Sequence, residues 1–466
     1  MKFLLINSSK EFLLYTSRKK IGTTQSSFSP PMGLLYVARA LEDAGHQVEV
    51  IDLFCEQHLE DAILRSLPSV DTVGISVYTK NYTVATDITK LIKQHDPNLP
   101  IILGGPHCTF NPKKALVDIP SADISVEGEG EPVINNIAQA LQGKSALADI
   151  PGLSYREQGT IRFSKPPVVV EDLDSLGFPS RHLVEKYEYG KMMNMFFYKP
   201  RFTALVSSRG CPFRCRFCTR HVTTMKRFRM RSAENVVREF QELQEKYRSV
   251  LIVDDNFLAD RKRANQILDG LIENKSDLEL FIEGARVDTA DRELYKKMKK
   301  AGVKQIAYGI ESGNQDVLDY YHKNVTLDQI RHALNLAREM HFVTLGTFIV
   351  GAPIETREHI ENTIKFACSL PLDIALFGQL AYQHGSDLWN EAVSCGKIKE
   401  DEGYAFTADK RRGLGNFTEE ELEKFCNQAF RRFFFRPRYL AEETVLAFLR
   451  RDFRLLKVGW SFLVQR

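Results

Sequence analysis

Three cysteines within eight positions are the residues of this chain best placed to do chemistry. Cys211, Cys215 and Cys218 stand in the run SSRGCPFRCRFCTR, separated by three residues and then by two. Three thiolates on one short loop can hold three irons of a [4Fe-4S] cube and leave the fourth iron open to a substrate or cofactor. Two other interpretations stay open at this point: a closed zinc site with His221 as the fourth ligand, and a chance cluster of buried thiols.

Length and composition limit the class of protein. The chain has 466 residues, enough for roughly two to four domains that each bury a core. Its 63 Lys and Arg against 60 Asp and Glu leave a formal net charge of +3, so the whole-molecule field gives no strong signal for nucleic acid. Eight cysteines are too few for a disulfide framework.

Hydropathy predicts a soluble, cytoplasmic protein. The apolar run near the first residue is too short for the core of a signal peptide. The longest uncharged apolar-rich run, residues 342–354, is shorter than the roughly 18 to 20 residues of a membrane span.

The first 150 residues alternate between apolar and amphipathic segments. The apolar segments are KFLLI, QVEVID, TVGISV, PIILGG and ADISVE, and the helical segments between them include residues 33–44, 58–66 and 83–95. This order predicts parallel βαβ units in a doubly wound α/β sheet. Ligands of such sheets lie at the carboxyl ends of the strands, where this chain has Ser76, Tyr78, residues 104–107 and residues 127–130.

A second alternating series begins near residue 201. Its six expected strands are FTALVSS, SVLIVDD, LELFIEG, KQIAYGIE, FVTLGTFIVG and LDIALFGQL, with helices such as residues 232–247 and 357–367 between them. Six βα repeats predict a partial (β/α)6 TIM-like barrel. We therefore expect four parts: a cobalamin-binding-like Rossmann-type domain at 1–150, a proline-bearing linker at 151–200, the partial barrel at 201–395 and a helical region at 396–466.

The cysteine run resembles the signature of the radical S-adenosylmethionine (SAM) superfamily. That signature is C-x3-C-x2-C at the end of the first barrel strand, with an aromatic residue, here Phe217, before the third cysteine. The resemblance implies that Cys211, Cys215 and Cys218 hold a [4Fe-4S] cluster whose open iron chelates SAM. One-electron reduction then cleaves SAM to methionine and a 5′-deoxyadenosyl radical.

The same resemblance assigns SAM contacts along the barrel. It implies that Asp254 and Asp255 bind the amino group and that Arg286 binds the carboxylate, which is simple charge complementarity. The remaining implied contacts are Glu311 and Ser312 at the ribose and Gly346 and Gly351, in the run GTFIVGAPIE, at the adenine. Residues 382–386, YQHGS, depart from the proline-glycine-threonine turn common in relatives, which indicates an unusual substrate pocket.

The N-terminal segments resemble the cobalamin (B12)-binding domain that precedes the barrel in one radical SAM class. The matching runs are SPPMGLLYVARAL, AGHQVEVID, GISV, GGPH and VEGEGE. The implied cobalamin contacts are Pro31, Gly33, Ser76, Tyr78, Gly104, Gly105, His107, Glu127 and Gly128.

Two sequence features bear on that assignment. The competing interpretation, a nicotinamide dinucleotide site, is disfavoured because the glycine run at 128–130 follows the fifth strand and lacks a third glycine. Residues 7–22 contain no histidine for an Asp-x-His-x-x-Gly motif, so we expect cobalamin to bind without a protein histidine on cobalt, and we expect His107 to be a loop or capping residue.

This domain order implies an enzyme that transfers a methyl group to an unactivated carbon, reduced by a flavodoxin or ferredoxin. The alternatives are cyclisation, rearrangement or carbon–carbon coupling on a lipid, tetrapyrrole or natural product, and a non-catalytic iron–sulfur electron-transfer protein. An electron carrier has no use for Arg286 or Glu311. The pattern identifies no catalytic residue beyond the cofactor sites.

Basic residues gather in two further places. Residues 431–440 and 448–463 interleave arginine with aromatic residues, which fits a helix packed on the barrel, a membrane-surface or lipid-substrate edge, or an RNA contact. Lys226, Arg227, Arg229 and Arg231 are interpreted as a solvated face ahead of a helix capped by Ser232.

Overall fold

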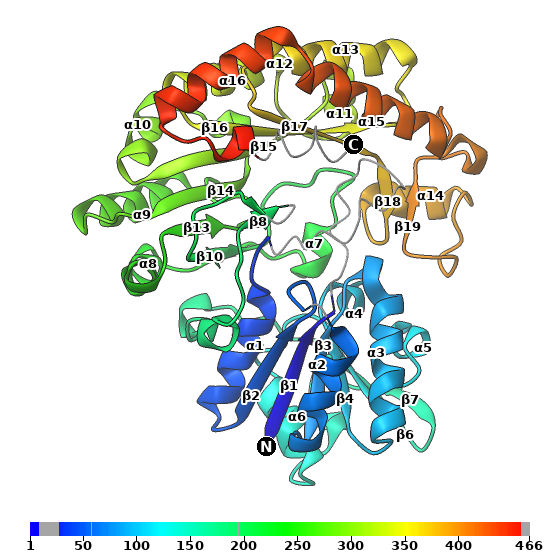
Figure 1. Ribbon diagram of the computed structural model, residues 1–466. Helices are drawn as coiled ribbons and strands as arrows, with labels where there is room; N and C mark the ends of the chain where they lie inside the picture. The colour runs from blue at the N-terminus through cyan, green and yellow to red at the C-terminus, as the bar shows by residue number, and fades with distance from the viewer. Residues whose placement is uncertain (9–27, 57, 193–194, 458–466) are drawn as a thin grey trace. The chain divides into compact units, whose positions relative to one another are not determined.

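A computed structural model describes residues 1–8, 28–56, 58–192 and 195–457. These residues form two compact units. The first unit holds the chain up to Tyr189 together with Val222–Arg229, and the second holds Gly190–His221 and the chain from Met230 onward. Figure 1 shows the elements of each unit.

The first unit is built on a seven-stranded sheet in the order β2-β1-β3-β4-β5-β6-β7. Its strands are β1 (Lys2–Asn7), β2 (Gln47–Asp52), β3 (Thr72–Ser76), β4 (Ile101–Gly104), β5 (Ile124–Val126), β6 (Leu153–Glu157) and β7 (Thr160–Phe163). Its helices are α1 (Met32–Asp43), α2 (Leu59–Ser66), α3 (Tyr82–His95), α4 (Pro106–Phe110), α5 (Ala115–Asp118) and α6 (Ile134–Leu141). The first five strands are parallel, and the order reverses at β1, which pairs with both β2 and β3. That reversal is the switch point at which doubly wound sheets bind ligands.

The segment expected to be a linker contains a β-hairpin that sequence analysis missed. Strands β6 and β7 extend the sheet in antiparallel sense, and Glu157 pairs with Thr160 across a two-residue turn. Gln158 and Gly159 both have positive φ, 48° and 78°, which is the backbone of a type I′ turn. Gln-Gly is a weaker turn signal than Asn-Gly, so the hairpin is not evident from its residues alone.

The second unit carries six parallel strands in sequential order. They are β10 (Phe202–Leu205), β13 (Ser249–Ile252), β14 (Glu279–Ala285), β15 (Val303–Glu311), β16 (Val343–Val350) and β17 (Ile374–Gln379). The main helices between and after them are α8 (Ala233–Lys246), α9 (Arg261–Glu273), α10 (Arg292–Lys300), α12 (Leu327–Glu339), α13 (Arg357–Ser369) and α15 (Glu419–Phe434). This arrangement confirms the predicted α/β fold with six βα repeats.

Side-chain caps fix where these helices begin. Ser232, as expected, accepts a hydrogen bond from the backbone N–H of Asn235, and Asp260 and Asp291 cap α9 and α10 in the same way. Thr356 and Thr418 start α13 and α15 with reciprocal capping boxes.

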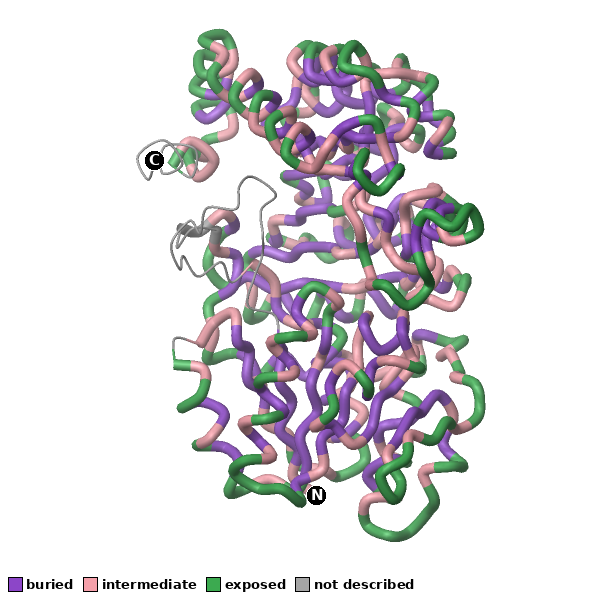
Figure 2. Tube along the Cα trace, turned by 90° about the vertical axis from the view of Figure 1, so that its right-hand side faces the viewer, coloured by how far each residue is buried: buried purple, intermediate pink, exposed green. Residues whose placement is uncertain are grey.

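The strands of this second sheet have two distinct faces. Along β16, Thr344, Phe348 and Val350 are buried, whereas Val343, Leu345, Thr347 and Ile349 on the opposite face are only half-buried. Phe348 and Val350 belong to the main core together with residues of the surrounding helices. We call the opposite, half-buried face the inner face. The buried strands of both units appear in purple in Figure 2.

Smaller elements complete the described chain. They are β8 (Lys191–Met192), β9 (Met195–Phe196), β11 (Ser208–Arg209), α7 (Arg220–Thr223), β12 (Arg229–Met230), α11 (Gln315–Tyr320), β18 (Ala381–Gln383), α14 (Asp387–Ser394), β19 (Ala405–Thr407) and α16 (Pro437–Arg450). The region expected to be helical from residue 396 is helical from Glu419, and before that β19 pairs with β18.

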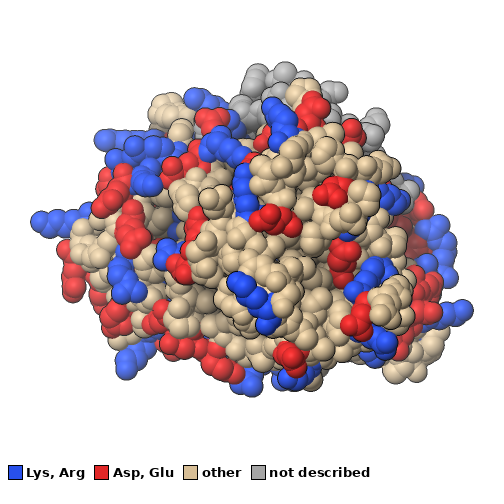
Figure 3. All heavy atoms as spheres, turned by 90° about the horizontal axis from the view of Figure 1, so that it is seen from below, with Lys and Arg blue, Asp and Glu red and all other residues tan. Residues whose placement is uncertain are grey.

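Two surface findings follow from the described residues. None of the helices in this part of the chain is both long and apolar enough to cross a membrane. On the face shown in Figure 3, Lys and Arg side chains alternate with Asp and Glu and form no continuous basic patch.

Candidate active site

The loop that carries the three cysteines is anchored by Asp254 at the end of β13. Its buried carboxylate accepts hydrogen bonds from the backbone N–H of Ser207 at 2.6 Å, from Ser207 Oγ at 2.5 Å and from Ser208 Oγ at 2.7 Å. Burial raises the pKa of Asp254, although these hydrogen bonds oppose the shift. Since its oxygens already accept three bonds, Asp254 positions the start of the cysteine loop.

The three cysteines are free, half-buried thiols on this loop. Cys218 N–H donates to the carbonyl of Cys215 at 3.0 Å and closes a tight turn between them. Burial raises the pKa of the Cys215 thiol to about 11, and it also raises the pKa values of Cys211 and Cys218. Such thiols lose their protons when a metal takes the sulfur.

Three thiols on one short loop fit a [4Fe-4S] cluster, because a cube takes one thiolate on each of three irons and leaves its fourth iron open. Among the described residues, no group of three or more His, Cys, Asp or Glu side chains is arranged around a single ion position.

Arg286 lies against the cysteine loop. Its guanidinium stacks over the ring of Phe213, between the first two cysteines, at 3.8 Å from the ring centroid. Asp288 accepts from it at 2.8 Å and the carbonyl of Lys323 at 2.9 Å. Arg286 is thus held rigidly where the sequence places a SAM-carboxylate contact.

Glu311 and Lys323 form a buried ion pair beside Cys215. Glu311 Oε1 lies 2.7 Å from Lys323 Nζ, and both side chains are 8% exposed. Glu311 has a left-handed backbone, φ 68°, a strained conformation for a residue other than glycine. A Cβ on Gly309 would come within 2.4 Å of Glu311 Oε1, so glycine leaves the room for this pair. Lys323 had no sequence signal.

An acidic pair lies on the inner face of the sheet with Arg220. The Asp255 carboxylate is 3.1 Å from Arg220 Nε. Both charges act on the pKa of Glu283, which Arg220 lowers and Asp255 raises. Leu280 and Ile282 of β14 belong to the helix-side core, which places Glu283 on the opposite face. Glu283 is accessible to solvent, yet protein atoms crowd its carboxylate and raise its pKa. No motif in the sequence marks Glu283.

The other predicted SAM residues divide between two environments. Phe217 contacts the ring of Tyr321 edge-on at 5.1 Å and stays near the cysteine loop. Ser312 is fully buried and bonded to Thr363 Oγ1 at 3.2 Å. A Cβ on Gly346 would meet Ile310 at 2.7 Å and Leu372 at 2.9 Å, so this glycine serves core packing. The structure does not bring Ser312 and Gly346 to the inner face.

Gly351 begins a tight turn held by Glu355. Its φ of 106° requires glycine, and its N–H and that of Ala352 donate to Glu355 Oε2 at 2.6 and 2.7 Å. Burial raises the pKa of Glu355 to about 7. Glu355 Oε1 and the nearby Tyr321 hydroxyl have no hydrogen-bond partner among the described residues.

In the first unit, the predicted cobalamin residues mark the carboxyl edge of the sheet. Ser76 of β3 stands opposite Gly104 of β4 in register, and Tyr78 beyond them is 46% exposed. Gly105 has φ 100°, and a Cβ there would come within 3.0 Å of the Val77 carbonyl. Pro31 precedes α1 as its N-cap, with Gly33 in the first turn. Bare backbone at this edge suits the broad face of a corrinoid.

His107 is a packing residue in the structure. It is fully buried, stacks on Tyr82 with ring centroids 5.2 Å apart, and places Nε2 3.5 Å from Asp118. The expectation of a loop or capping role is not met, because His107 lies within α4, whose N-cap is Gly105. Its ring is not presented to a ligand at the sheet edge.

Residues 222–229 pack against the segment that follows β5. Glu127 is half-buried there, and burial raises its pKa. The Met225 methyl lies 2.1 Å from where a Gly128 Cβ would stand, and the φ of 82° at Gly128 favours glycine there. Arg229 makes a two-pronged ion pair with Glu129 at 2.8 and 2.9 Å, with side chains 6% and 10% exposed.

The expectation of a solvated face at Lys226–Arg231 is therefore wrong for two of its arginines. Arg229 is buried on Glu129, and Arg231 is buried in an ion pair with Glu239. Each buried charge is paired with a carboxylate outside the basic run: Glu129 lies 100 positions from Arg229, and Glu239 lies eight positions from Arg231, in the following helix α8.

A six-stranded parallel α/β barrel fragment with a three-thiol loop at the carboxyl ends of its strands defines an iron–sulfur enzyme of the radical SAM type. The Radical SAM superfamily model matches residues 205–367, and the B12 binding domain model matches residues 18–138.

Similar proteins agree with both matches. An uncharacterized methyltransferase of Pyrococcus horikoshii is 31% identical over 450 residues, 95% of this chain and 94% of its own. The anaerobic magnesium-protoporphyrin IX monomethyl ester cyclase of Rubrivivax gelatinosus is 28% identical, over 88% of this chain and 75% of its own.

A solved structure shares the fold. The radical SAM methyltransferase TsrM of Kitasatospora setae, with cobalamin and a [4Fe-4S] cluster bound, superposes with a TM-score of 0.67 at 17% identity, over 86% of this chain and 76% of that one. Another structure of TsrM holds its tryptophan substrate and a SAM analogue.

The chain belongs to the cobalamin-binding radical SAM family. The predicted family, fold class, enzyme class and cofactors are confirmed. A [4Fe-4S] cluster, SAM and cobalamin serve a radical enzyme that acts on a small molecule. The non-catalytic electron-transfer alternative is excluded by this membership. The individual SAM and cobalamin contacts stay predictions.

Proposed function

We propose that this enzyme transfers a methyl group to an unactivated carbon of a small molecule. The observation that carries the proposal is that one chain combines a cysteine loop at the barrel with a B12-binding unit, in an order shared nearly end to end with a relative named a methyltransferase. When bound, the cluster with SAM supplies a carbon-centred radical and cobalamin supplies a methyl group.

The chain's own residues supply position and shelter. Asp254 fixes the start of the cysteine loop, and Arg286, pinned by Asp288, offers a cation for the SAM carboxylate. Half-buried Leu345, Thr347 and Ile349 of β16 give the inner face a largely apolar surface, which keeps water away from a reactive radical. Glu283 offers the substrate one acidic group on that face.

Ring closure is the second candidate. The similarity to an anaerobic magnesium-protoporphyrin IX monomethyl ester cyclase over 88% of the chain favours it. A ring closure would use the same cluster and SAM residues, with a lipid, tetrapyrrole or natural product as substrate.

Three statements about the cellular setting belong to the proposal. The enzyme works in the cytoplasm, and a flavodoxin or ferredoxin supplies its electrons. Its C-terminal residues contact a membrane surface.

The decisive experiment is anaerobic reconstitution with iron, sulfide and hydroxocobalamin, followed by SAM carrying a trideuterated methyl group and dithionite. We expect about four irons per chain, bound cobalt, released 5′-deoxyadenosine and trideuterated methylcobalamin. Methylcobalamin formation supports methyl transfer. Release of 5′-deoxyadenosine with no methylation of bound cobalt would contradict methyl transfer and favour ring closure.

A further inference from the structure

Helix α16 exposes apolar side chains that a surface helix normally buries. Its outward residues Leu440, Val445, Phe448 and Leu449 are 47%, 57%, 66% and 61% exposed. Its inward face buries Leu446 and Ala447 together with the charged side chains of Glu443 and Arg450. A helix on a protein surface normally turns its apolar stripe to the core and its charges to water. The outward face of α16 is therefore an unexplained apolar surface.

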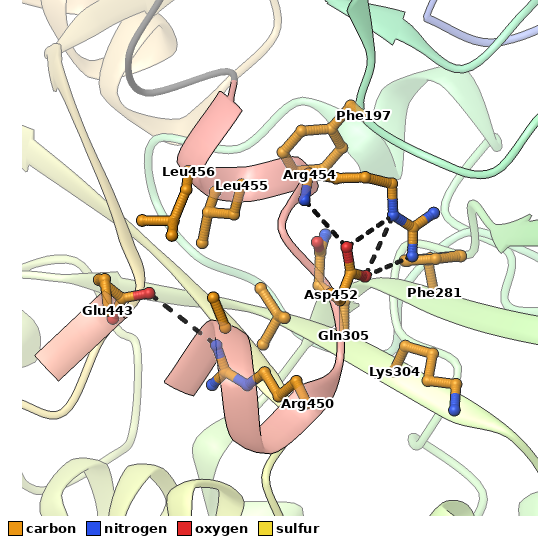
Figure 4. Close-up of a pocket in the computed structure, with 12 residues that line it drawn as sticks. Phe197, Phe281, Lys304, Gln305, Glu443, Arg450, Asp452, Arg454, Leu455 and Leu456 are labelled. Carbon is orange, nitrogen blue, oxygen red and sulfur yellow. Dashed lines mark hydrogen bonds and ion pairs between the residues drawn. The ribbon is translucent and has the colours of Figure 1, made fainter. Parts of the chain in front are cut away.

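The inward polar contacts prevent α16 from rotating to hide that surface. Arg450 donates to Asp373 Oδ1 at 2.6 Å and to the carbonyl of Phe342 at 2.7 Å, just before β17 and β16 begin. Tyr439 donates to the carbonyl of Asp373 at 2.6 Å. Figure 4 shows Glu443 and Arg450 pointing from α16 into a pocket shared with Gln305 and Phe281 of the barrel. Rotation would bury Leu440 and Leu449, but it would expose Leu446 and break the bonds of these charged groups.

The apolar surface continues past both ends of the helix. Phe435 before α16 is 49% exposed and Phe453 after it is 40% exposed. The ring of Phe453 contacts that of Phe448 edge-on, with centroids 5.0 Å apart. We call these exposed residues on and beside α16 the apolar face (Phe435, Leu440, Val445, Phe448, Leu449 and Phe453). Contiguous exposed apolar side chains of this size mark interaction sites.

Positive charge surrounds the apolar face. Residues 431–457 contain eight basic and three acidic residues, and Arg431, Arg438, Arg451 and Lys457 are exposed. The acids are engaged within the fold: Glu443 lies beside Arg450, Asp452 is 2.5 Å from Arg454, and Glu442 is 2.7 Å from Arg438. Ion pairs also occupy Arg432, Arg438, Arg450 and Arg454, so the positive charge around the face comes mainly from the exposed Arg431, Arg451 and Lys457.

We propose that the apolar face of α16 docks this enzyme on an anionic lipid bilayer. Phenylalanine and leucine side chains at the level of the acyl boundary with arginines beside the headgroups are the arrangement of interfacial helices. Anionic headgroups attract each nearby basic residue. A second copy placed on the same face by a twofold axis would bring the two cationic margins together, which disfavours that occupant.

Vesicle sedimentation of the full-length, cofactor-loaded enzyme tests the proposal. We expect binding to phosphatidylcholine vesicles that contain phosphatidylglycerol and much weaker binding to pure phosphatidylcholine. The double variant Phe448→Glu/Leu449→Glu should reduce binding by at least about tenfold, because two apolar side chains no longer leave water. Val117→Glu, at a valine 60% exposed on the first unit, should bind like the wild type.

Further readouts separate this proposal from the proposed function. Because the altered residues are exposed, melting temperature and 5′-deoxyadenosine release without vesicles should match the wild type. Equal vesicle binding by wild type and double variant would overturn the proposal. So would light scattering that shows a dimer of wild type and a monomer of the double variant, since the face would then join two copies.

Discussion

Two neighbouring aspartates at the cysteine loop, Asp254 and Asp255, differ in burial and therefore in the role that we assign to each. Asp254 and Asp255 are neighbours with the same chemistry, yet Asp254 is buried on Ser207 and Ser208 while Asp255 meets Arg220 on the inner face. We infer that Asp254 is a positioning residue and that Asp255 is the acid left for a bound amino group. Phe213 and Lys323 also belong to the site. Phe213 lies under the Arg286 guanidinium, and Lys323 is paired with Glu311.

Removing one cysteine should abolish the cluster and SAM cleavage together. Cys215→Ala leaves two thiolates for the cluster, so we expect iron content and 5′-deoxyadenosine release both to fall close to zero. Cys395→Ala, at an exposed thiol outside the loop, is the matched control and should keep both. Retained SAM cleavage in Cys215→Ala would contradict the cluster assignment.

The buried carboxyl of Glu355 should make stability depend on pH. Its pKa is about 7 in the folded chain against a usual value of 4.5. Between these values the folded state binds more protons than the unfolded state, so stability falls as pH rises from about 4.5 to about 7 and then levels off.

Glu355→Gln removes that titration and keeps an acceptor oxygen for Gly351 and Ala352. We expect the melting temperatures of variant and wild type to differ little at pH 5. At pH 8 we expect the unfolding free energy of the variant to exceed that of the wild type by up to about 3 kcal/mol. The exposed Glu358→Gln is the control. A difference independent of pH would argue against a buried, titrating Glu355.

At the scale of elements, the segment after the cysteines links two parts of the chain. Residues 222–229 begin four positions after Cys218 but pack in the first unit, where Met225 covers Gly128 and Arg229 binds Glu129. Gly128 had been assigned to cobalamin from the resemblance. The Met225 methyl occupies the space where a Gly128 Cβ would stand. We therefore infer that the VEGEGE run anchors residues 222–229.

Reversing one charge of the Glu129–Arg229 pair should loosen the cysteine loop. Either Glu129→Arg or Arg229→Glu strands a buried charge, at a cost of about 3 kcal/mol in unfolding free energy, and we expect faster loss of iron to a chelator. The double reversal should recover part of both losses. Arg227→Glu breaks only the exposed pair with Glu171 and is the control, with little effect.

Iron loss from Arg229→Glu that equals the wild type, despite a lower melting temperature, would mean that the pair stabilises the first unit alone. In that case it does not hold the cysteine loop.

At the scale of the whole molecule, the chain joins two α/β units that each present the carboxyl ends of parallel strands. The first carries the bare edge formed by Ser76, Gly104 and Gly105, and the second carries the cysteine loop and Arg286. Strand ends are where α/β sheets bind ligands, so a two-cofactor enzyme follows from two such units.

Cobalamin should bind to this molecule without histidine on cobalt. His107 is fully buried against Tyr82 and Asp118, and the first-strand region has no histidine in its sequence. We expect the electron paramagnetic resonance spectrum of bound cob(II)alamin to be identical for protein made with natural and with ¹⁵N-labelled histidine. A change in the nitrogen splitting, lost again in His107→Phe, would show histidine ligation.

The local pattern of residues was enough for the cofactor class and for most elements. The thiol spacing, the alternation of apolar runs and the capping residues Ser232 and Thr418 all act over a few positions, and the corresponding loop, strands and helices are present. Family membership follows from the same short motifs because cluster chemistry requires three thiols on one loop.

Contacts between distant residues could be decided only by the tertiary structure. The partners of Asp254, Arg229 and Lys323 come from 12 to 100 positions away. Only the fold shows that Asp254 accepts from Ser207 and Ser208 whereas Asp255 pairs with Arg220. The orientation of helix α16 has the same cause, since Arg450 bonds to Asp373 and to the carbonyl of Phe342, 77 and 108 positions away. Helical periodicity defines the two faces of a helix, and packing against the barrel determines which face is exposed to water.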